Sequence, residues 1–124
     1  MRLFTKSLIA AATLAGMATA ASAADPSGTW TRPSTGAKIS FYDCSGKLCA
    51  KIVGVKDETK KSMVGKVIMT GATKSGDNAW KGDLLNLEDG NTYSGTVTMI
   101  SASSLNLKGC ALGGLVCKDE NLVK

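Results

Sequence analysis

The chain contains no histidine among its 124 residues, and its four cysteines fall in two closely spaced pairs. Histidine is the side chain that most readily exchanges a proton near neutral pH, and it is the commonest metal ligand. Without histidine, Ser-His-Asp and Cys-His catalysis are excluded, and so are histidine-based metal sites. The sequence therefore points away from the most frequent kinds of small enzyme.

The acidic residues offer no readable catalytic pair. Two paired carboxylates can perform acid–base chemistry, but the carboxylates here lie mostly at expected turns, and no motif places two of them together. They are Asp43, Asp57, Glu58, Asp77, Asp83, Glu88, Asp89, Asp119 and Glu120. We therefore predict a protein that is not an enzyme, with no catalytic residues, no metal site and no cofactor. A carboxylate-based hydrolase acting on the cell wall is the weaker alternative.

Basic charge is neither concentrated nor interleaved with aromatic residues, which make up only 5% of the chain. A nucleic-acid-binding protein typically shows both features. The lysines are instead scattered and usually lie near an acid, as in the dense run at 56–61. We expect an ordinary solvated surface and no nucleic-acid partner.

A long apolar run is missing too, since a membrane-spanning helix needs about 20 residues. Residues 1–23 are typical of a secretory signal peptide, with a positively charged start, an apolar stretch at 7–17 and a small-residue cleavage site at 21–23. No cysteine directly follows that site, so no lipid anchor is expected. We predict that residues 24–124 form one periplasmic or secreted domain without stable membrane insertion. The alternative is a retained N-terminal anchor.

The cysteines that the chain does have are Cys44, Cys49, Cys110 and Cys117. Four cysteines allow three pairings, and the short spacings favour Cys44–Cys49 and Cys110–Cys117. A redox motif has two intervening residues rather than four or six, and cysteine zinc sites belong mostly to reducing compartments. We therefore predict two structural disulfides in an oxidising compartment, with a redox pair or a metal site as the alternatives.

The first cysteine pair predicts a clamped hairpin, with strands at 37–44 and 49–55 and a four-residue turn between them. In such a hairpin Cys44 and Cys49 face each other directly and point to the same side. Both share their face with polar residues, so we expect both sulfurs on the outer surface.

The rest of residues 24–124 alternates strand patterns with Gly, Asn, Asp and Ser. Further strands are expected at 28–31, 65–73, 79–86, 92–100, 104–109 and 120–124. The clearest alternation places Tyr93, Val97 and Met99 inside and threonines outside, and at 65–73 we expect Val67 and Met69 on one face. About eight strands with short links predict an all-β fold, a small antiparallel up-and-down barrel.

Three glycines fall at inward-facing strand positions: Gly54, Gly82 and Gly95. Glycine inside a small barrel allows sharp coiling of the strands, or it leaves room for a ligand. We favour coiling.

Several segments occur in a characteristic order: Gly28-Thr29-Trp30, Cys44-x4-Cys49, Trp80-x-Gly82, the segment 88–95 and the cysteine loop 109–117. Together they resemble the bacterial secreted family catalogued as domain of unknown function 2147, over nearly all of residues 24–124. The resemblance implies a lipocalin-like barrel with the first tryptophan at one end. It implies no catalytic residues, because none are established for the family.

The chain departs from this family pattern in two places. Residues 56–63 form a shorter, lysine-rich loop where the family usually has a longer acidic one. The family also tends to end with a tryptophan and an arginine, where this chain has Leu122 and Lys124. The arginine–tryptophan stack at the barrel floor is therefore not expected here, and Lys124 is left as a weaker cover for Trp30.

The first functional hypothesis is a non-enzymatic binding module that holds a small apolar or amphipathic ligand inside the barrel. Aromatic and methionine side chains supply adaptable apolar area, so the expected ligand-binding residues are Trp30, Phe41, Met69, Trp80, Tyr93 and Met99. The alternative for these residues is a plain core, since eight strands enclose room for side chains or for one small ligand.

The second hypothesis is a disulfide-clamped module that binds another envelope protein, or the wall, without a small-molecule ligand. Its candidate surfaces are the lysine-rich loop at 56–63 and the tip Leu112-Gly-Gly-Leu115. The alternative for both is a solvated loop and a flexible turn.

Overall fold

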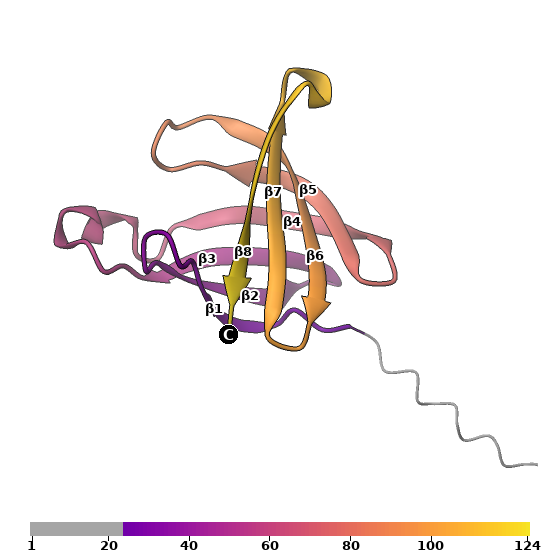
Figure 1. Cartoon of the computed structure of the whole chain (residues 1–124), viewed down its shortest axis with the longest axis horizontal. Helices are drawn as coiled ribbons and strands as arrows, with labels where there is room; N and C mark the ends of the chain where they lie inside the picture. The colour runs from indigo at the N-terminus through magenta and orange to yellow at the C-terminus, as the bar shows by residue number, and fades with distance from the viewer. Residues whose placement is uncertain (1–23) are drawn as a thin grey trace, which may run out of the picture.

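The computed structural model describes residues 24–124, which form a closed antiparallel β-barrel (Figure 1). Each strand pairs with the next in chain order, and the last returns to the first. The strands are β1 (Gly28–Thr31), β2 (Lys38–Cys44), β3 (Lys47–Gly54), β4 (Val67–Gly76), β5 (Ala79–Leu85), β6 (Thr92–Ser101), β7 (Ser104–Ala111) and β8 (Val116–Val123). The all-β class and the up-and-down topology predicted from the sequence are confirmed.

The predicted signal peptide, residues 1–23, lies outside the described residues. Two short 3-10 helices, η2 (Glu58–Met63) and η3 (Leu112–Gly114), interrupt the links between strands. Within residues 24–124 no helix has both the length and the apolar character needed to cross a membrane.

The β2–β3 hairpin is tighter than the cysteine spacing predicts. Its turn contains only Ser45 and Gly46, with φ of 59° and 83°. Positive φ at both residues is typical of two-residue hairpin turns, because the twist of such a turn matches the twist of the two strands. Cys44 therefore pairs with Lys47, and the disulfide links Cys44 diagonally to Cys49, two residues further along β3. The predicted four-residue turn with directly opposed cysteines is wrong.

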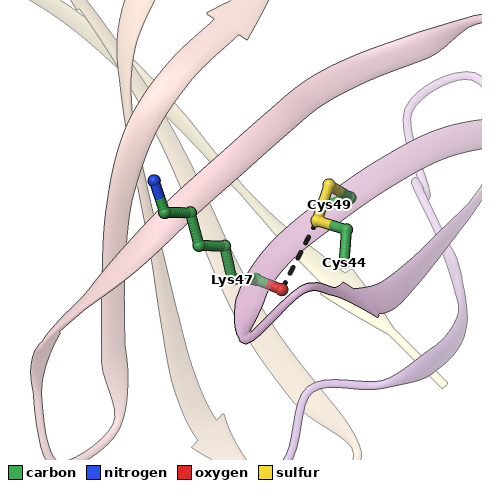
Figure 2. Close-up of a disulfide and its surroundings, with 3 residues drawn as sticks. All are labelled: Cys44, Lys47 and Cys49. Atoms are coloured by element: carbon green, nitrogen blue, oxygen red, sulfur yellow. Dashed lines mark hydrogen bonds between the residues drawn. A yellow bond between two sulfur atoms is a disulfide. The ribbon is translucent and has the colours of Figure 1, made fainter.

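The Cys44–Cys49 bridge lies beside the turn, where the Lys47 carbonyl oxygen is 3.4 Å from the Cys44 sulfur (Figure 2). Cys44 is half-buried, but Cys49 is only 5% exposed. The ladder pairs Cys49 with Tyr42 on the outward face, as predicted, but Cys49 is buried there rather than exposed. The predicted pairing itself is confirmed.

Strand β4 contains a β-bulge that breaks its alternation. Ala50 pairs with Met69 and Lys51 with Val67, so Ile68 is an extra residue in β4. Met69 is fully buried, whereas Val67 is 39% exposed. The prediction that Val67 and Met69 share a face is wrong, because the bulge turns the chain over between them.

The last hairpin is longer than predicted. Strand β7 continues to Ala111 and β8 already begins at Val116, with η3 between them. Cys110 and Cys117 are direct partners in the ladder, and a disulfide joins them as predicted. The cysteine segment is therefore a clamped extension of the sheet rather than a loop.

Large side chains fill one end of the barrel, which we call the closed end. The Trp30 ring is fully buried, and its Nε1 donates a hydrogen bond of 2.8 Å to the Pro26 carbonyl oxygen. The Lys124 ammonium lies 5.0 Å from the centre of the Trp30 ring, which confirms the expected cover. In the core as a whole, the largest fully buried side chains of the described residues are Trp30, Phe41, Met69, Leu105, Leu122 and Val97.

A row of three glycines crosses β5, β6 and β7, because Gly82 pairs with Gly95 and Gly95 with Gly109. A Cβ added to Gly82 would lie 2.8 Å from the Ala72 Cα, and one added to Gly95 would lie 2.8 Å from the Leu84 Cβ. Carbon atoms normally approach to about 3.5–4.0 Å. These two positions therefore favour the coiling interpretation, since the strands pass too closely for a side chain.

We expect Gly95→Ala to lower the free energy of unfolding by about 1–3 kcal/mol, because the methyl group overpacks the barrel. Gly109→Ala is the matched control, since the nearest neighbour of its added Cβ is an ordinary 3.5 Å away. Urea denaturation of both variants measures the difference. Equal losses would contradict a steric role specific to Gly95.

Candidate functional site: a cavity at the open end of the barrel

The end of the barrel opposite Trp30 contains a cavity of about 660 Å³, and we call this end the open end. Four segments surround it: the β1–β2 loop, η2, the β5–β6 loop and the β7–β8 hairpin. In Figure 1 these segments lie at the left and the top of the barrel, whereas the C-terminus lies at the bottom. Small-molecule sites usually measure about 300–1,000 Å³, so the cavity is the candidate functional site.

Aliphatic side chains form the walls of the cavity. They come from the inner faces of six strands and include Ile39, Ile52, Ile68, Leu84, Leu107 and Leu122. Their positions follow from strand alternation, because every second residue of a barrel strand points to the interior. Leu84 and Leu107 are only partly buried, so apolar surface remains accessible inside the barrel. Such walls favour an apolar occupant.

Two ion pairs lie at the mouth of the cavity. The Arg32 Nε donates to the Glu120 carboxylate at 2.5 Å, and the Ser34 hydroxyl donates to the same carboxylate. On another side of the mouth, the Lys60 Nζ of η2 donates to the Glu88 carboxylate of the β5–β6 loop at 2.9 Å. Together these contacts give an apolar cavity a charged rim.

The Arg32–Glu120 pair lies where the strand ladder of the barrel is shortest. Strands β1 and β8 share one register pair, Thr31 with Val123. Nearer the mouth, the side-chain contacts of Arg32 and Ser34 with Glu120 connect the β1–β2 loop to β8. The ion pair therefore adds side-chain contacts where β1 and β8 share few backbone hydrogen bonds.

The surroundings of Glu120 lower the pKa of its carboxyl. Partial burial raises this pKa, but the hydrogen bonds from Ser34 and Arg32, together with the Arg32 charge, outweigh that effect. A lowered folded pKa adds stability above the unfolded pKa, and the stability is lost as pH falls through the folded pKa. With 39% of the Arg32 side chain and 25% of the Glu120 side chain exposed, solvent screening limits the contribution to about 1 kcal/mol or less.

We expect Glu120→Gln to reduce stability at neutral pH, and this deficit to shrink as the pH falls through the lowered pKa of Glu120, where the wild-type carboxyl also becomes neutral. Urea denaturation over a pH series measures the deficit. Glu58→Gln is the control, because Glu58 and Lys61 form a pair on the surface with side chains 78% and 67% exposed. A deficit for Glu120→Gln that is independent of pH would contradict this account.

The structure separates the residues predicted to bind a ligand. Of the six, Tyr93 lines the cavity, and its hydroxyl donates a hydrogen bond to the Asp89 carboxylate. Trp30, Phe41 and Met69 lie fully buried in the core. Their contact with a ligand stays a prediction, and the cavity walls are formed by aliphatic residues instead.

The other two predicted residues also lie away from the cavity. Trp80 is 8% exposed, and the Lys74 ammonium lies 5.6 Å from the centre of its ring. Met99 borders a second hollow, at the closed end, together with Asn78 and Lys124. The prediction from residue type also missed Arg32 and Glu120, whose proximity depends on the closure of the barrel.

Comparison with known proteins agrees with this architecture. A solved structure of protein HP1028 from the human pathogen Helicobacter pylori, described as belonging to the lipocalin family, superposes with a TM-score of 0.67. The two chains are 19% identical, and the match covers 82% of this chain and 83% of that chain. At this identity the likeness shows a lipocalin-like fold.

A comparison with curated proteins finds no match. A family profile described as "Uncharacterized protein conserved in bacteria (DUF2147)" matches residues 28–124. This range includes every strand of the barrel and both disulfides. The chain therefore belongs to the DUF2147 family of bacterial proteins, the family that its motifs resemble.

Proposed function

We propose that this protein is an exported, non-enzymatic binding module that holds one small apolar or amphipathic molecule in the open-end cavity. The observation that carries the proposal is a cavity of about 660 Å³ with aliphatic walls and a charged rim. The walls favour an apolar body through the hydrophobic effect, and the rim offers partners to a polar group. The two disulfides support a location outside the cytoplasm, in the periplasm or secreted.

In this proposal the ligand lies against the isoleucine and leucine walls, with Tyr93 near the mouth. The buried residues Trp30, Phe41 and Met69 act as the packed base beneath it. Because neither tryptophan lines the cavity, tryptophan emission is a poor reporter of binding. An added fluorescent probe reports more directly.

The apolar fluorescent probe N-phenylnaphthylamine provides this test, since its emission rises in an apolar site. We expect a saturable rise at micromolar protein, reversed by dodecanoate. Leu107→Trp should weaken the rise, because the larger ring occupies part of the cavity. Ile100→Trp is the control, since Ile100 is 60% exposed at the closed end. Near-ultraviolet circular dichroism verifies that both variants fold, and equal probe binding by the two would contradict the proposed site.

A second candidate function is a protein-interaction module of the envelope that needs no small ligand. The observation in its favour is η2, in which no residue is buried and Lys60 and Lys61 are adjacent. Lys60 already pairs with Glu88, whereas the Lys61 side chain is 67% exposed. Crosslinking in the native envelope discriminates the two functions. A specific crosslinked protein that is lost in Lys61→Glu, together with no probe binding, would favour this candidate.

A further inference from the structure

The tip of the β7–β8 hairpin exposes three large apolar side chains. Leu112, Leu115 and Val116 are 73%, 86% and 51% exposed, and the two leucines are the most exposed large hydrophobic residues in the described part of the chain. We call these three residues the apolar tip. Figure 1 shows the tip projecting beyond the rest of the barrel.

The apolar tip is held in a defined shape. The Cys110–Cys117 disulfide closes its base, and the Leu115 N–H donates a hydrogen bond of 3.3 Å to the Leu112 carbonyl oxygen. Leu112 has a φ of 55°, a left-handed conformation that costs energy for a residue other than glycine. A glycine would adopt this conformation more easily, and a polar side chain would suit the exposure better. The leucine satisfies neither preference, which points to a role in contact with something apolar.

The charge of the hairpin indicates what covers the tip. From Lys108 to Lys118, the part of the hairpin nearest the tip, the charged residues are these two exposed lysines, and the nearest acidic residues, Asp119 and Glu120, follow directly after Lys118. Leucines flanked by lysines suit the boundary of a bilayer with anionic headgroups. A stable protein interface needs about 800 Å² on each partner, which three side chains on a narrow tip do not supply. A bilayer accepts a narrow apolar point without a complementary pocket.

We propose that the apolar tip docks the protein on an anionic lipid surface. Leu112 and Leu115 enter the boundary between headgroups and acyl chains, while Lys108 and Lys118 lie among the headgroups. Val116 belongs both to the tip and to the cavity wall, so docking brings the open end of the barrel to the lipid. The docking does not require the cavity to hold a ligand, and the two proposals fail independently.

Co-sedimentation with lipid vesicles tests this inference. The vesicles contain phosphatidylcholine alone or phosphatidylcholine with anionic phosphatidylglycerol. The protein is the full chain, expressed with its N-terminal segment and purified with both disulfides formed. We expect binding to the anionic vesicles that weakens as salt is added, because salt screens the lysines. The affinity of the double variant Leu112→Ser/Leu115→Ser for these vesicles should be lower than that of the wild type by a factor of about ten. Ile100→Ser, which changes an exposed isoleucine at the other end of the barrel, should bind like the wild type.

A second measurement locates the contact. Leu115→Trp should show a blue-shifted emission that is quenched by brominated acyl chains, and Ile100→Trp should show neither effect. Any of these results would overturn the inference: no binding of the wild type to anionic vesicles, an equal loss in Leu112→Ser/Leu115→Ser and Ile100→Ser, or a dimer in sedimentation that disappears in Leu112→Ser/Leu115→Ser. A crosslink from the tip to an envelope protein without vesicle binding would also overturn it.

Discussion

Replacement of Trp30 by alanine is expected to lower the free energy of unfolding by about 3–5 kcal/mol. The Trp30 ring is fully buried, donates a hydrogen bond to Pro26 and lies beneath the Lys124 ammonium. Its removal leaves a cavity in the closed end and an unpaired carbonyl. Since small domains are stable by only about 5–15 kcal/mol, the variant should be close to unfolding. Urea denaturation followed by circular dichroism measures the loss.

Two matched variants show whether the loss has this origin. Trp30→Phe keeps much of the buried ring area but not the donor, so we expect a clearly smaller loss than for alanine. Val53→Ala changes a residue that is 38% exposed on the outside of β3. This variant should change the urea concentration at the unfolding midpoint only slightly. If Trp30→Ala unfolded at the same urea concentration as Val53→Ala, Trp30 would not be a principal support of the core.

Removal of both disulfides is expected to lower the free energy of unfolding by about 4 kcal/mol. The bridges close short segments, with sequence separations of 5 and 7 residues. The chain-entropy model assigns about 2 kcal/mol to each loop of this length. The double variants Cys44→Ala/Cys49→Ala and Cys110→Ala/Cys117→Ala should each lose about half of the total.

The two bridges clamp hairpins at opposite ends of the barrel, because successive turns of an up-and-down barrel alternate between its ends. Their losses should therefore add in the quadruple alanine variant, as expected for distant sites. Urea denaturation of the three variants in the same buffer measures the additivity. A quadruple variant as stable as the wild type would show that the bridges are dispensable for the fold.

Much of the fold could be predicted because its signals are local. The alternation at 92–100 and the short links between strands indicate an up-and-down barrel, and the short spacings indicate the disulfide pairs. The bulge at Ile68 could not be predicted in this way, because an extra residue becomes visible only against its partner strand. The two-residue turn was missed because it requires Ser45, and not only Gly46, to adopt a positive φ.

The candidate site was less predictable because it depends on the ends of the barrel. Trp30 and Ile39 both point inward, yet Trp30 packs in the closed end while Ile39 lines the cavity. Neither residue type nor strand pairing distinguishes them, because Trp30 and Ile39 are direct partners in the β1–β2 ladder. Arg32 and Glu120 are 88 residues apart in the sequence, and only barrel closure brings them together.

The isoleucine methyl groups provide the most direct test of the proposed cavity. Residues 24–124 contain four isoleucines: Ile39, Ile52 and Ile68 line the cavity, and Ile100 is exposed at the closed end. In methyl-labelled protein titrated with dodecanoate, we predict saturable shifts of the first three signals and an unchanged Ile100 signal. Shifts of Ile100 alone, or of none of the four with dodecanoate and N-phenylnaphthylamine alike, would contradict a ligand site inside the barrel.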